Sequence, residues 1–255
     1  MIAVGSGKGG VGKSTVALNV AIALAEAGES VGILDADVYA PDIPRMVDLK
    51  RKDSAPPQHW TLASTKKQVL EPVDAFGIKI ISTGFIVTDA QPMSWASSLV
   101  NRLLWQFMFE TQWGDLDYLF VDLPPGTADL QQSVAKLGIT GALIVVTPQD
   151  VAHLDAKKLV SMYRAAGIPV IGGIENMSGI ACPHCKERIE LFPRVREDRS
   201  IWAMGVENLG AVPMDPAAAN AGDRGVPILI DEPGAASAHS FREVARAVAR
   251  TVSTS

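Results

Sequence analysis

The sequence predicts an α/β fold: a mostly parallel, twisted β-sheet with helices on both faces. Short apolar runs rich in β-branched residues alternate along the chain with amphipathic segments of helix length, which is the order of strand–helix–strand units. Several of these runs are hydrophobic at nearly every position, as expected for strands that are covered on both faces. A chain of 255 residues suits one large domain, and we expect residues 1–255 to form it.

The elements follow from these patterns in chain order. The expected strands are Ile2–Val4, Val31–Leu34, Ile78–Ser82, Tyr118–Val121, Ala142–Thr147, Val170–Ile174 and Gly210–Val212, with Ile228–Ile230 as a further candidate. The expected helices are Lys13–Ala27, Trp95–Thr111, Leu130–Leu137, His153–Ala166, Arg199–Met204, Ala217–Ala221 and Ser237–Thr251. The polar stretch Lys50–Pro57 is interpreted as a surface excursion, because the strand pattern resumes after it.

Composition excludes several classes of protein. The 23 basic and 28 acidic residues give a formal net charge of −5, which argues against a dedicated nucleic-acid coat. Two cysteines cannot build a disulfide framework. No apolar stretch is long enough to span a bilayer, and the N-terminus has no signal-peptide pattern. We therefore expect a cytoplasmic protein with neither nucleic acid nor membrane among its partners.

A glycine-rich loop between the first strand and the first helix carries the strongest motif. It matches G-x-x-x-x-G-K-[ST] and consists of Gly7, Lys8, Gly9, Gly10, Val11, Gly12, Lys13, Ser14 and Thr15. Glycines let successive backbone amides turn toward a phosphate, and the helix N-terminus adds positive potential. Lys13 is predicted to reach the β- and γ-phosphates and the Ser14 hydroxyl to ligate Mg²⁺. The sequence therefore predicts an ATP site.

Carboxylates follow two of the expected strands, at the sheet edge where open α/β folds bind ligands. Asp35 and Asp37 end one strand and lie two residues apart, so on an extended chain they point to the same side. Asp122 ends another strand in a Walker B pattern, which holds Mg²⁺ through water. Gly126 follows where a switch backbone needs conformational freedom. A single aspartate after a strand is also compatible with an ordinary helix or turn cap.

The two cysteines, Cys182 and Cys185, form one C-x-x-C. A tetrahedral metal or an iron–sulfur cluster usually takes four such ligands, so a full thiolate site requires a second chain, placed by a twofold axis. Three other interpretations remain open: a structural zinc knuckle shared across a dimer, a redox dithiol, and two incidental thiols.

Together these motifs resemble the Mrp/ApbC family of iron–sulfur cluster carriers, which are P-loop ATPases of the deviant Walker A (SIMIBI) type. The resemblance rests on residues 7–15, 35–44, 117–127, 147–151, 175–178 and 182–185. It implies a homodimer with two ATP sites at its interface, slow ATP hydrolysis, and a labile 4Fe–4S cluster that is received from a donor, held between two subunits and passed to apo-proteins.

The resemblance also implies roles for individual residues. Lys8, Lys13 and Ser14 would contact nucleotide or Mg²⁺, with Lys8 reaching the partner's phosphates. Asp37 would orient or deprotonate the attacking water and Asp35 would support the Mg²⁺ shell. Cys182 and Cys185 would ligate the cluster, Asn176 would hydrogen-bond adenine, and Pro213 and Asp215 would line the base pocket. Ala40 and Ala128 stand where the family usually has glycine, which puts the hydrolysis rate in question.

A MinD/ParA-type spatial-organisation ATPase and an ATPase with a structural zinc bridge are the alternatives. The first is tested by the C-terminal helix, where Phe241, Val244, Ala245 and Val248 form an apolar stripe. That stripe is poor in large side chains, so we expect it to pack on the sheet rather than on a membrane.

Overall fold

The computed structural model describes residues 1–49, 70–85, 97–126, 138–182, 184–185 and 187–253. Its main sheet has eight strands in the order β10-β7-β6-β1-β5-β2-β4-β3. All neighbours are parallel except β3, which pairs with β4 in the antiparallel sense. The strands are β1 (Ile2–Gly5), β2 (Val31–Asp35), β3 (Val73–Ala75), β4 (Ile78–Ser82), β5 (Tyr118–Asp122), β6 (Gly141–Val146), β7 (Val170–Asn176) and β10 (Asn208–Val212).

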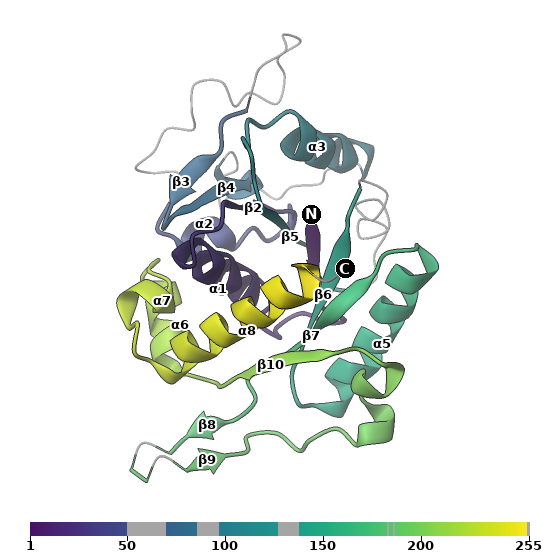
Figure 1. Cartoon of the computed structure of the whole chain (residues 1–255), viewed down its shortest axis with the longest axis vertical. Helices are drawn as coiled ribbons and strands as arrows, with labels where there is room; N and C mark the ends of the chain where they lie inside the picture. Colours follow the sequence, from purple (N-terminus) through teal and green to yellow (C-terminus); the bar gives the residue numbers. More distant parts are fainter. Residues whose placement is uncertain (50–69, 86–96, 127–137, 183, 186, 254–255) are drawn as a thin grey trace.

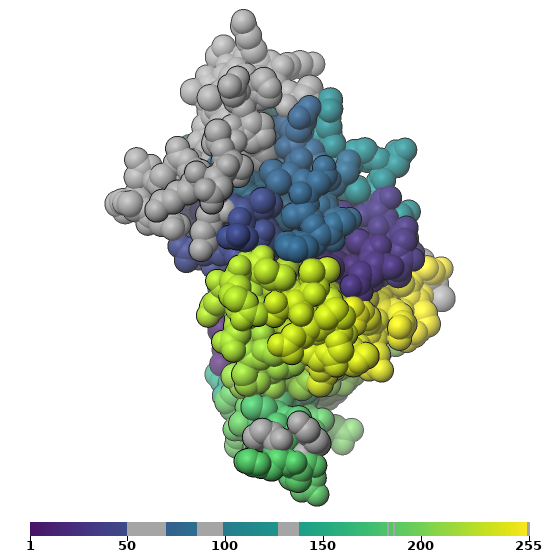
Figure 2. Space-filling view, turned by 90° about the vertical axis from the view of Figure 1, so that its left-hand side faces the viewer, coloured from purple at the N-terminus to yellow at the C-terminus, as the bar shows by residue number. Residues whose placement is uncertain are grey.

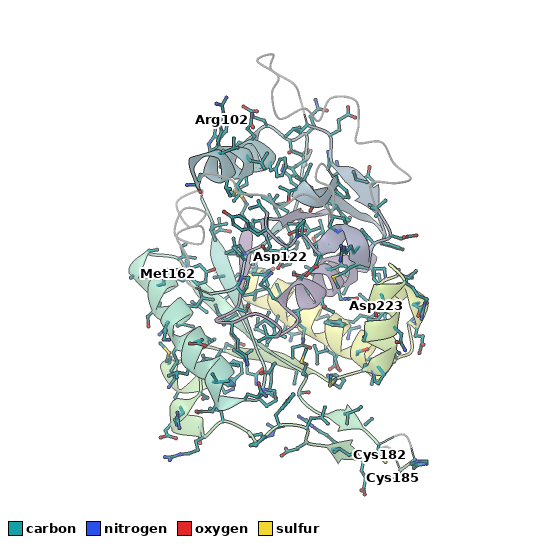
Figure 3. The ribbon with its side chains drawn as sticks, turned by 180° about the vertical axis from the view of Figure 1, so that it is seen from behind. Arg102, Asp122, Met162, Cys182, Cys185 and Asp223 are labelled. Carbon is teal, nitrogen blue, oxygen red and sulfur yellow. The ribbon has the colours of Figure 1, made fainter. Side chains whose placement is uncertain are left out.

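Helices cover both faces of this sheet, as predicted. Helix α8 crosses in front of β7 and β10 beside α1 in Figure 1, whereas α5 lies in front when the molecule is seen from behind in Figure 3. The helices are α1 (Lys13–Glu26), α2 (Ile43–Met46), α3 (Ser97–Phe109), α5 (Asp150–Ala165), α6 (Pro216–Asp223), α7 (Ile228–Asp231) and α8 (Ala236–Ser253). The 3₁₀ turns are η1 (Thr83–Phe85), η2 (Glu197–Arg199) and η3 (Trp202–Met204).

The core lies on both sides of the central strands, which are buried at every position in β1, β2, β5 and β6. Leu18 and Ile22 of α1 pack there together with Phe120 of β5, all without measurable exposure. Helix α1 is apolar nearly all round because it is covered by α8 as well as by the sheet. The buried core therefore fixes the strand ends that carry the predicted site residues.

All seven of these expected strands are present, with ends that differ by at most two residues. The candidate strand Ile228–Ile230 is wrong, because these residues form α7. Pro227 precedes this helix, and its carbonyl accepts hydrogen bonds from the amides of Ile230 and Asp231 at 2.9 and 3.0 Å. Three consecutive apolar residues do not distinguish a short strand from one turn of helix.

The predicted helices also need correction at some points. Arg199–Met204 is not a continuous helix: η2 and η3 are separated by Ser200 and Ile201, and the backbone of Ser200 is extended at ψ 161°. The remaining helices are confirmed where the structure describes them. Leu130–Leu137, Lys50–Pro57, Ala128 and the first two residues of Trp95–Thr111 lie outside the described residues.

A second, two-stranded sheet was not predicted. Strands β8 (Ile180–Ala181) and β9 (Arg188–Ile189) form an antiparallel hairpin that projects from the C-terminal end of β7. Figure 2 shows the same segment as a separate projection below the body of the molecule. Strands of two residues carry no detectable periodicity, so the sequence did not reveal them.

Candidate functional site

The phosphate loop joins β1 to α1, as predicted. Different physical constraints require glycine at its individual positions. Gly10 and Gly12 adopt φ values of +78° and +79°, which favour glycine because a Cβ there crowds the backbone. At Gly7 the reason is space: a Cβ would lie 2.3 Å from the backbone carbonyl carbon of Asp155 in α5. A Cβ at Gly9 would have no neighbour closer than 3.8 Å.

The two lysines of the loop have different partners. Lys13 is buried, and its Nζ lies 2.6 Å from Asp122 Oδ1 and 3.2 Å from Ser14 Oγ. Lys8 donates from Nζ to Gln149 Oε1 at 3.2 Å. The ammonium predicted to bind phosphate is therefore held at the loop by the Walker B carboxylate, 109 residues along the chain.

Asp35 and Asp122 lie side by side at the ends of β2 and β5, where they are paired in register. Both are fully buried. Burial raises the pKa of Asp35 well above its usual range, and the neighbouring Asp122 charge adds to this, against the hydrogen bond that Ser82 donates at 2.9 Å. Burial also raises the pKa of Asp122, while Lys13 opposes the rise.

These residues fit a magnesium ion held beside a nucleotide. Asp122 Oδ2 is buried and accepts no hydrogen bond from the described residues. The Ser14 hydroxyl and Asp122 Oδ1 are both hydrogen-bonded to the Lys13 ammonium. An orphaned buried carboxylate oxygen beside a hydroxyl is a suitable donor set for a hard cation that keeps some of its waters.

Asp37 lies just beyond Asp35, in the loop after β2, and is only partly buried. Its Oδ1 accepts the Ala40 amide at 3.2 Å, and its own amide donates to Asp35 Oδ1 at 3.2 Å. Burial raises the pKa of Asp37, with the Asp122 charge contributing and the Ala40 amide and Lys13 opposing. Asp35 and Asp37 thus both interact with the charges of Asp122 and Lys13, and Asp37 is the more exposed of the two.

Gly126 follows β5 and connects it to the phosphate loop. Its φ is +91°, and its amide donates to the Ser6 carbonyl at 2.9 Å. Ser6 in turn donates from its hydroxyl to the Lys8 carbonyl at 3.0 Å. The predicted switch glycine therefore lies against the base of the phosphate loop.

The residues predicted to surround the adenine base differ in their contacts. Asn176 donates from Nδ2 to the Val11 carbonyl at 2.8 Å, directly against the loop. Asp215 caps α6 by accepting the Ala217 amide at 3.0 Å, and its second oxygen accepts the Ser237 hydroxyl at 2.7 Å. Pro213 is partly buried and follows β10. Asp215 therefore has a structural role as a helix cap.

Both cysteines lie at the end of the β8–β9 hairpin, far from Asp122 (Figure 3). Cys182 is partly buried and its amide donates to the Glu187 carbonyl at 2.8 Å; Cys185 is exposed. No disulfide joins them. Within the described part of the chain, no cluster of three or more His, Cys, Asp or Glu side chains could hold a metal ion. One chain therefore presents two thiols on a projecting tip, and the described residues of the tip do not complete a metal site.

Two residues near the site were missed by sequence reasoning. Gln149 holds Lys8, and it belongs to the quoted stretch 147–151, to which no role was assigned. Glu175 is the second-to-last residue of β7 and its side chain is buried; burial raises its pKa, opposed by Arg194 and Arg188. A charged residue close to the end of an otherwise apolar strand was the available signal.

The C-terminal helix packs as predicted. Phe241, Val244, Ala245 and Val248 are all buried, and α8 lies along α1 and β10. Arg242 lies at its surface and binds Glu26 of α1 through two hydrogen bonds of 2.8 and 3.2 Å. Among the described residues, no helix combines the length and apolarity that a membrane span needs.

Comparison with known proteins agrees with the fold and the motifs. A family model of the ParA group described as NUBPL iron-transfer P-loop NTPase matches residues 1–249. An iron–sulfur cluster carrier protein of Aquifex aeolicus is 43% identical over 254 residues, which cover 99% of this chain and 68% of that protein. The iron–sulfur cluster transfer protein NUBPL of Mus musculus is 38% identical over 258 residues, which cover 100% of this chain and 78% of that protein.

Solved structures give the same picture. The nucleotide-binding protein of Archaeoglobus fulgidus in complex with ADP is 35% identical, with a TM-score of 0.70 over 88% of this chain and 85% of that one. The septum site-determining protein MinD of Pyrococcus horikoshii, complexed with Mg-ADP, has a TM-score of 0.73 at 23% identity over 99% and 97% of the two chains. The second likeness concerns the fold alone, and it confirms the predicted α/β class.

Proposed function

Because this chain belongs to the family of NUBPL-type iron-transfer P-loop NTPases, we propose that it binds and hydrolyses ATP and carries an iron–sulfur cluster to apo-proteins. The cluster is cargo, held between the cysteine pairs of two subunits. The observation that carries this proposal is the projecting hairpin, which presents two free thiols of one C-x-x-C. Half of a four-thiolate site at an exposed tip suits a cluster that is shared and then released.

The nucleotide chemistry rests on the phosphate loop and the strand ends. Lys13, whose ammonium bonds Asp122 and Ser14 without nucleotide, would turn its donors toward the phosphates when nucleotide binds. Asp122 and Ser14 are the residues that would hold Mg²⁺, which when bound supplies charge neutralisation to the phosphate oxygens. Asp37 orients the attacking water, since it is the most accessible of the three carboxylates and its raised pKa brings it closer to that of a general base.

A dimer is required by the cargo and is supported by the resemblance of the Lys8 loop. In the single chain Lys8 binds Gln149, a neutral partner that it exchanges at low cost for a phosphate of the second subunit. The two-fold arrangement then brings together two nucleotide sites and two cysteine pairs.

Anaerobic reconstitution with ferrous iron and sulfide tests the proposal. The wild-type chain is expected to bind both in stoichiometric amounts and to sediment as a dimer, whereas Cys182→Ser and Cys185→Ser lose the cluster. ATPase activity is expected to persist in the cysteine variants and to vanish in Lys13→Ala. Binding of zinc with no uptake of iron and sulfide supports the structural-zinc alternative and contradicts the proposal.

A further inference from the structure

The strand end next to the phosphate loop and the root of the cysteine hairpin are only a few residues apart in sequence. Strand β7 ends at Asn176 and β8 begins at Ile180. Asn176 donates to the Val11 carbonyl at 2.8 Å, and a Cβ on Gly12 would lie 2.2 Å from Asn176 Nδ2 and 3.7 Å from the terminal carbon of Met177. The N-terminal end of this short linker is thus packed directly on the phosphate loop.

The other end of the linker is held by the hairpin. Arg188 of β9 donates from Nη2 to the Ser178 carbonyl. A Cβ on Gly179 would lie 2.8 Å from Arg188 Nε and 2.9 Å from the Ile189 carbonyl oxygen, so the arginine side chain covers the linker backbone. Arg188 also pairs in register with Ala181, next to Cys182. One side chain therefore joins the linker to the strand that positions the cysteines.

Between these contacts the linker takes a conformation that side chains seldom adopt. Met177 has φ +55°, a left-handed value that persists in a non-glycine residue only where the surroundings impose it. The linker is also fixed to β10, because the Ser178 amide donates to Val212 O at 3.0 Å and Gly179 O accepts the Met214 amide at 2.7 Å. Such a tightly held turn transmits a shift at one end to the other more readily than a loose loop does.

Charge supports the same connection. Glu175, one residue before Asn176, is 7% exposed and faces the positive charges of Arg194 and Arg188. Arg194 in turn binds the exposed Glu190 at 2.8 Å. A nearly buried carboxylate at the end of β7 thereby attracts arginines that belong to the hairpin and to the segment after it.

We propose that Arg188 is a positioning residue that couples the nucleotide site to the cysteine pair through the path Val11–Asn176–Ser178–Arg188. A nucleotide that rearranges the phosphate loop alters the Asn176 contact, the linker turns, and Arg188 moves β9 and the two thiols with it. This deepens the proposed function and rests on it for its purpose, since a carrier needs its nucleotide state to change how the cargo is held. It is nevertheless testable without any cluster.

The test measures thiol reactivity of the metal-free chain of 255 residues. The rate at which Cys182 and Cys185 react with 5,5′-dithiobis(2-nitrobenzoate) is recorded with and without Mg-ADP. The chain has two cysteines in all, so the signal reports the hairpin alone. The protein is used at a concentration where sedimentation shows the same oligomeric state in both conditions, which removes shielding by dimerisation.

Mg-ADP is expected to change the wild-type rate by about fivefold or more, the lower end of ordinary coupling between sites. In Arg188→Met the change falls below about 1.5-fold, while ADP affinity stays within about twofold of wild type. The matched control is Arg196→Gln, whose exposed guanidinium binds Asp198 two residues away, and it keeps the full response. Glu175→Gln, which keeps the shape of the buried side chain, is expected to reduce the response as well.

A wild-type rate that does not respond to Mg-ADP overturns the inference, and so does a full response in folded Arg188→Met. If Arg188→Met does not fold, as judged by circular dichroism, Glu175→Gln decides in its place. Iron and sulfide uptake by the same wild-type preparation separates the two proposals. A nucleotide response without uptake keeps the coupling and refutes the carrier, whereas uptake without a response does the reverse.

Discussion

The close approach of Gly7 to α5 gives a sharp stability prediction. A Cβ on Gly7 would lie 2.3 Å from the carbonyl carbon of Asp155 and 2.4 Å from the amide nitrogen of Ala156, both backbone atoms. Ordinary contacts of this kind begin at 3.4 Å, so about 1 Å of separation is missing. Helix α5 cannot retreat freely, because it buries Leu159, Val160 and Tyr163.

Gly7→Ala is therefore expected to lower the free energy of unfolding by about 3 kcal/mol, toward the upper end of the cost of overpacking. For a domain of this size the melting temperature should fall by roughly 6–12 °C. Two glycines of the same loop are matched controls. Gly9→Ala meets nothing closer than 3.8 Å and should change stability by less than about 0.5 kcal/mol. Gly10→Ala meets no atom within 4 Å but has φ +78°, so its cost is about 1–2 kcal/mol.

The assay is thermal and urea unfolding, followed by circular dichroism in the absence of nucleotide. Leaving nucleotide out matters, because a loop variant that binds ATP poorly would otherwise lose ligand stabilisation as well. The expected order of destabilisation is Gly7→Ala, then Gly10→Ala, then Gly9→Ala. Equal stabilities for Gly7→Ala and Gly9→Ala would refute the reasoning, since the two differ chiefly in what their Cβ meets.

Three further predictions concern the strand ends and the C-terminal helix. Asp37→Asn is expected to lower kcat for ATP hydrolysis by about a hundredfold or more and to leave ADP affinity within about twofold; an unchanged kcat contradicts the water-orienting role. Asp35→Asn should gain stability relative to wild type as pH rises. Burial and Asp122 raise the folded-state pKa of Asp35, so the stability contributed by its protonated form is complete below the unfolded pKa near 3.9 and is lost as pH rises toward the folded pKa. Urea unfolding across this pH range checks it, and a pH-independent difference would contradict the buried environment. Phe241→Ala should destabilise the chain by about 3–5 kcal/mol, because Phe241 is 1% exposed, whereas His239→Ala on the exposed face of α8 should have little effect. Equal effects would favour the membrane-anchor interpretation of this helix.

The sheet and the phosphate loop were predictable from sequence because each depends on local patterns. Strands such as Tyr118–Asp122 are buried at every position, so they appear as continuous apolar runs. The loop needs particular residue types at fixed spacing, and Gly10 and Gly12 show the positive φ that this spacing predicts. Their positions in the fold followed once strand and helix were recognised on either side.

The partners of these residues were less predictable, because they are distant in sequence. Lys8 binds Gln149, 141 residues away, and Asn176 binds Val11, 165 residues away. The strand prediction for Ile228–Ile230 failed for a different reason. The run is too short for its period to be measured, and its helical form is seen in the hydrogen bonds that the Pro227 carbonyl accepts. The strands β8 and β9 beside the cysteines were missed for the same reason, because each has two residues. Local signals identified the chemistry, whereas the contacts that regulate it come from tertiary packing.

The phosphate loop of the nucleotide-free chain is held by two contacts that a nucleotide would replace. Lys13 is bound to Asp122 at 2.6 Å on the β5 side, and Val11 accepts Asn176 at 2.8 Å on the β7 side. The first contact is a buried ion pair, so removing its lysine without a substitute charge is costly. Phosphates would replace the carboxylate as the partner of Lys13, and Mg²⁺ would supply the positive charge that the buried Asp122 then needs, which ties occupancy of the loop to the carboxylate that would hold Mg²⁺.

The second contact leads away from the phosphates toward the linker and the cysteine hairpin. Because both contacts end on the same few residues of one loop, a single binding event perturbs them together. In the sheet, β5 lies directly beside β1 on one side, whereas β7 lies on the other side of β1 with β6 between them. Nucleotide binding at β1 is therefore positioned to act on hydrolysis through β5 and on the thiols through β7. Lys13→Ala and Arg188→Met should accordingly have separable effects: the first removes hydrolysis, and the second removes the response of the cysteines while hydrolysis continues.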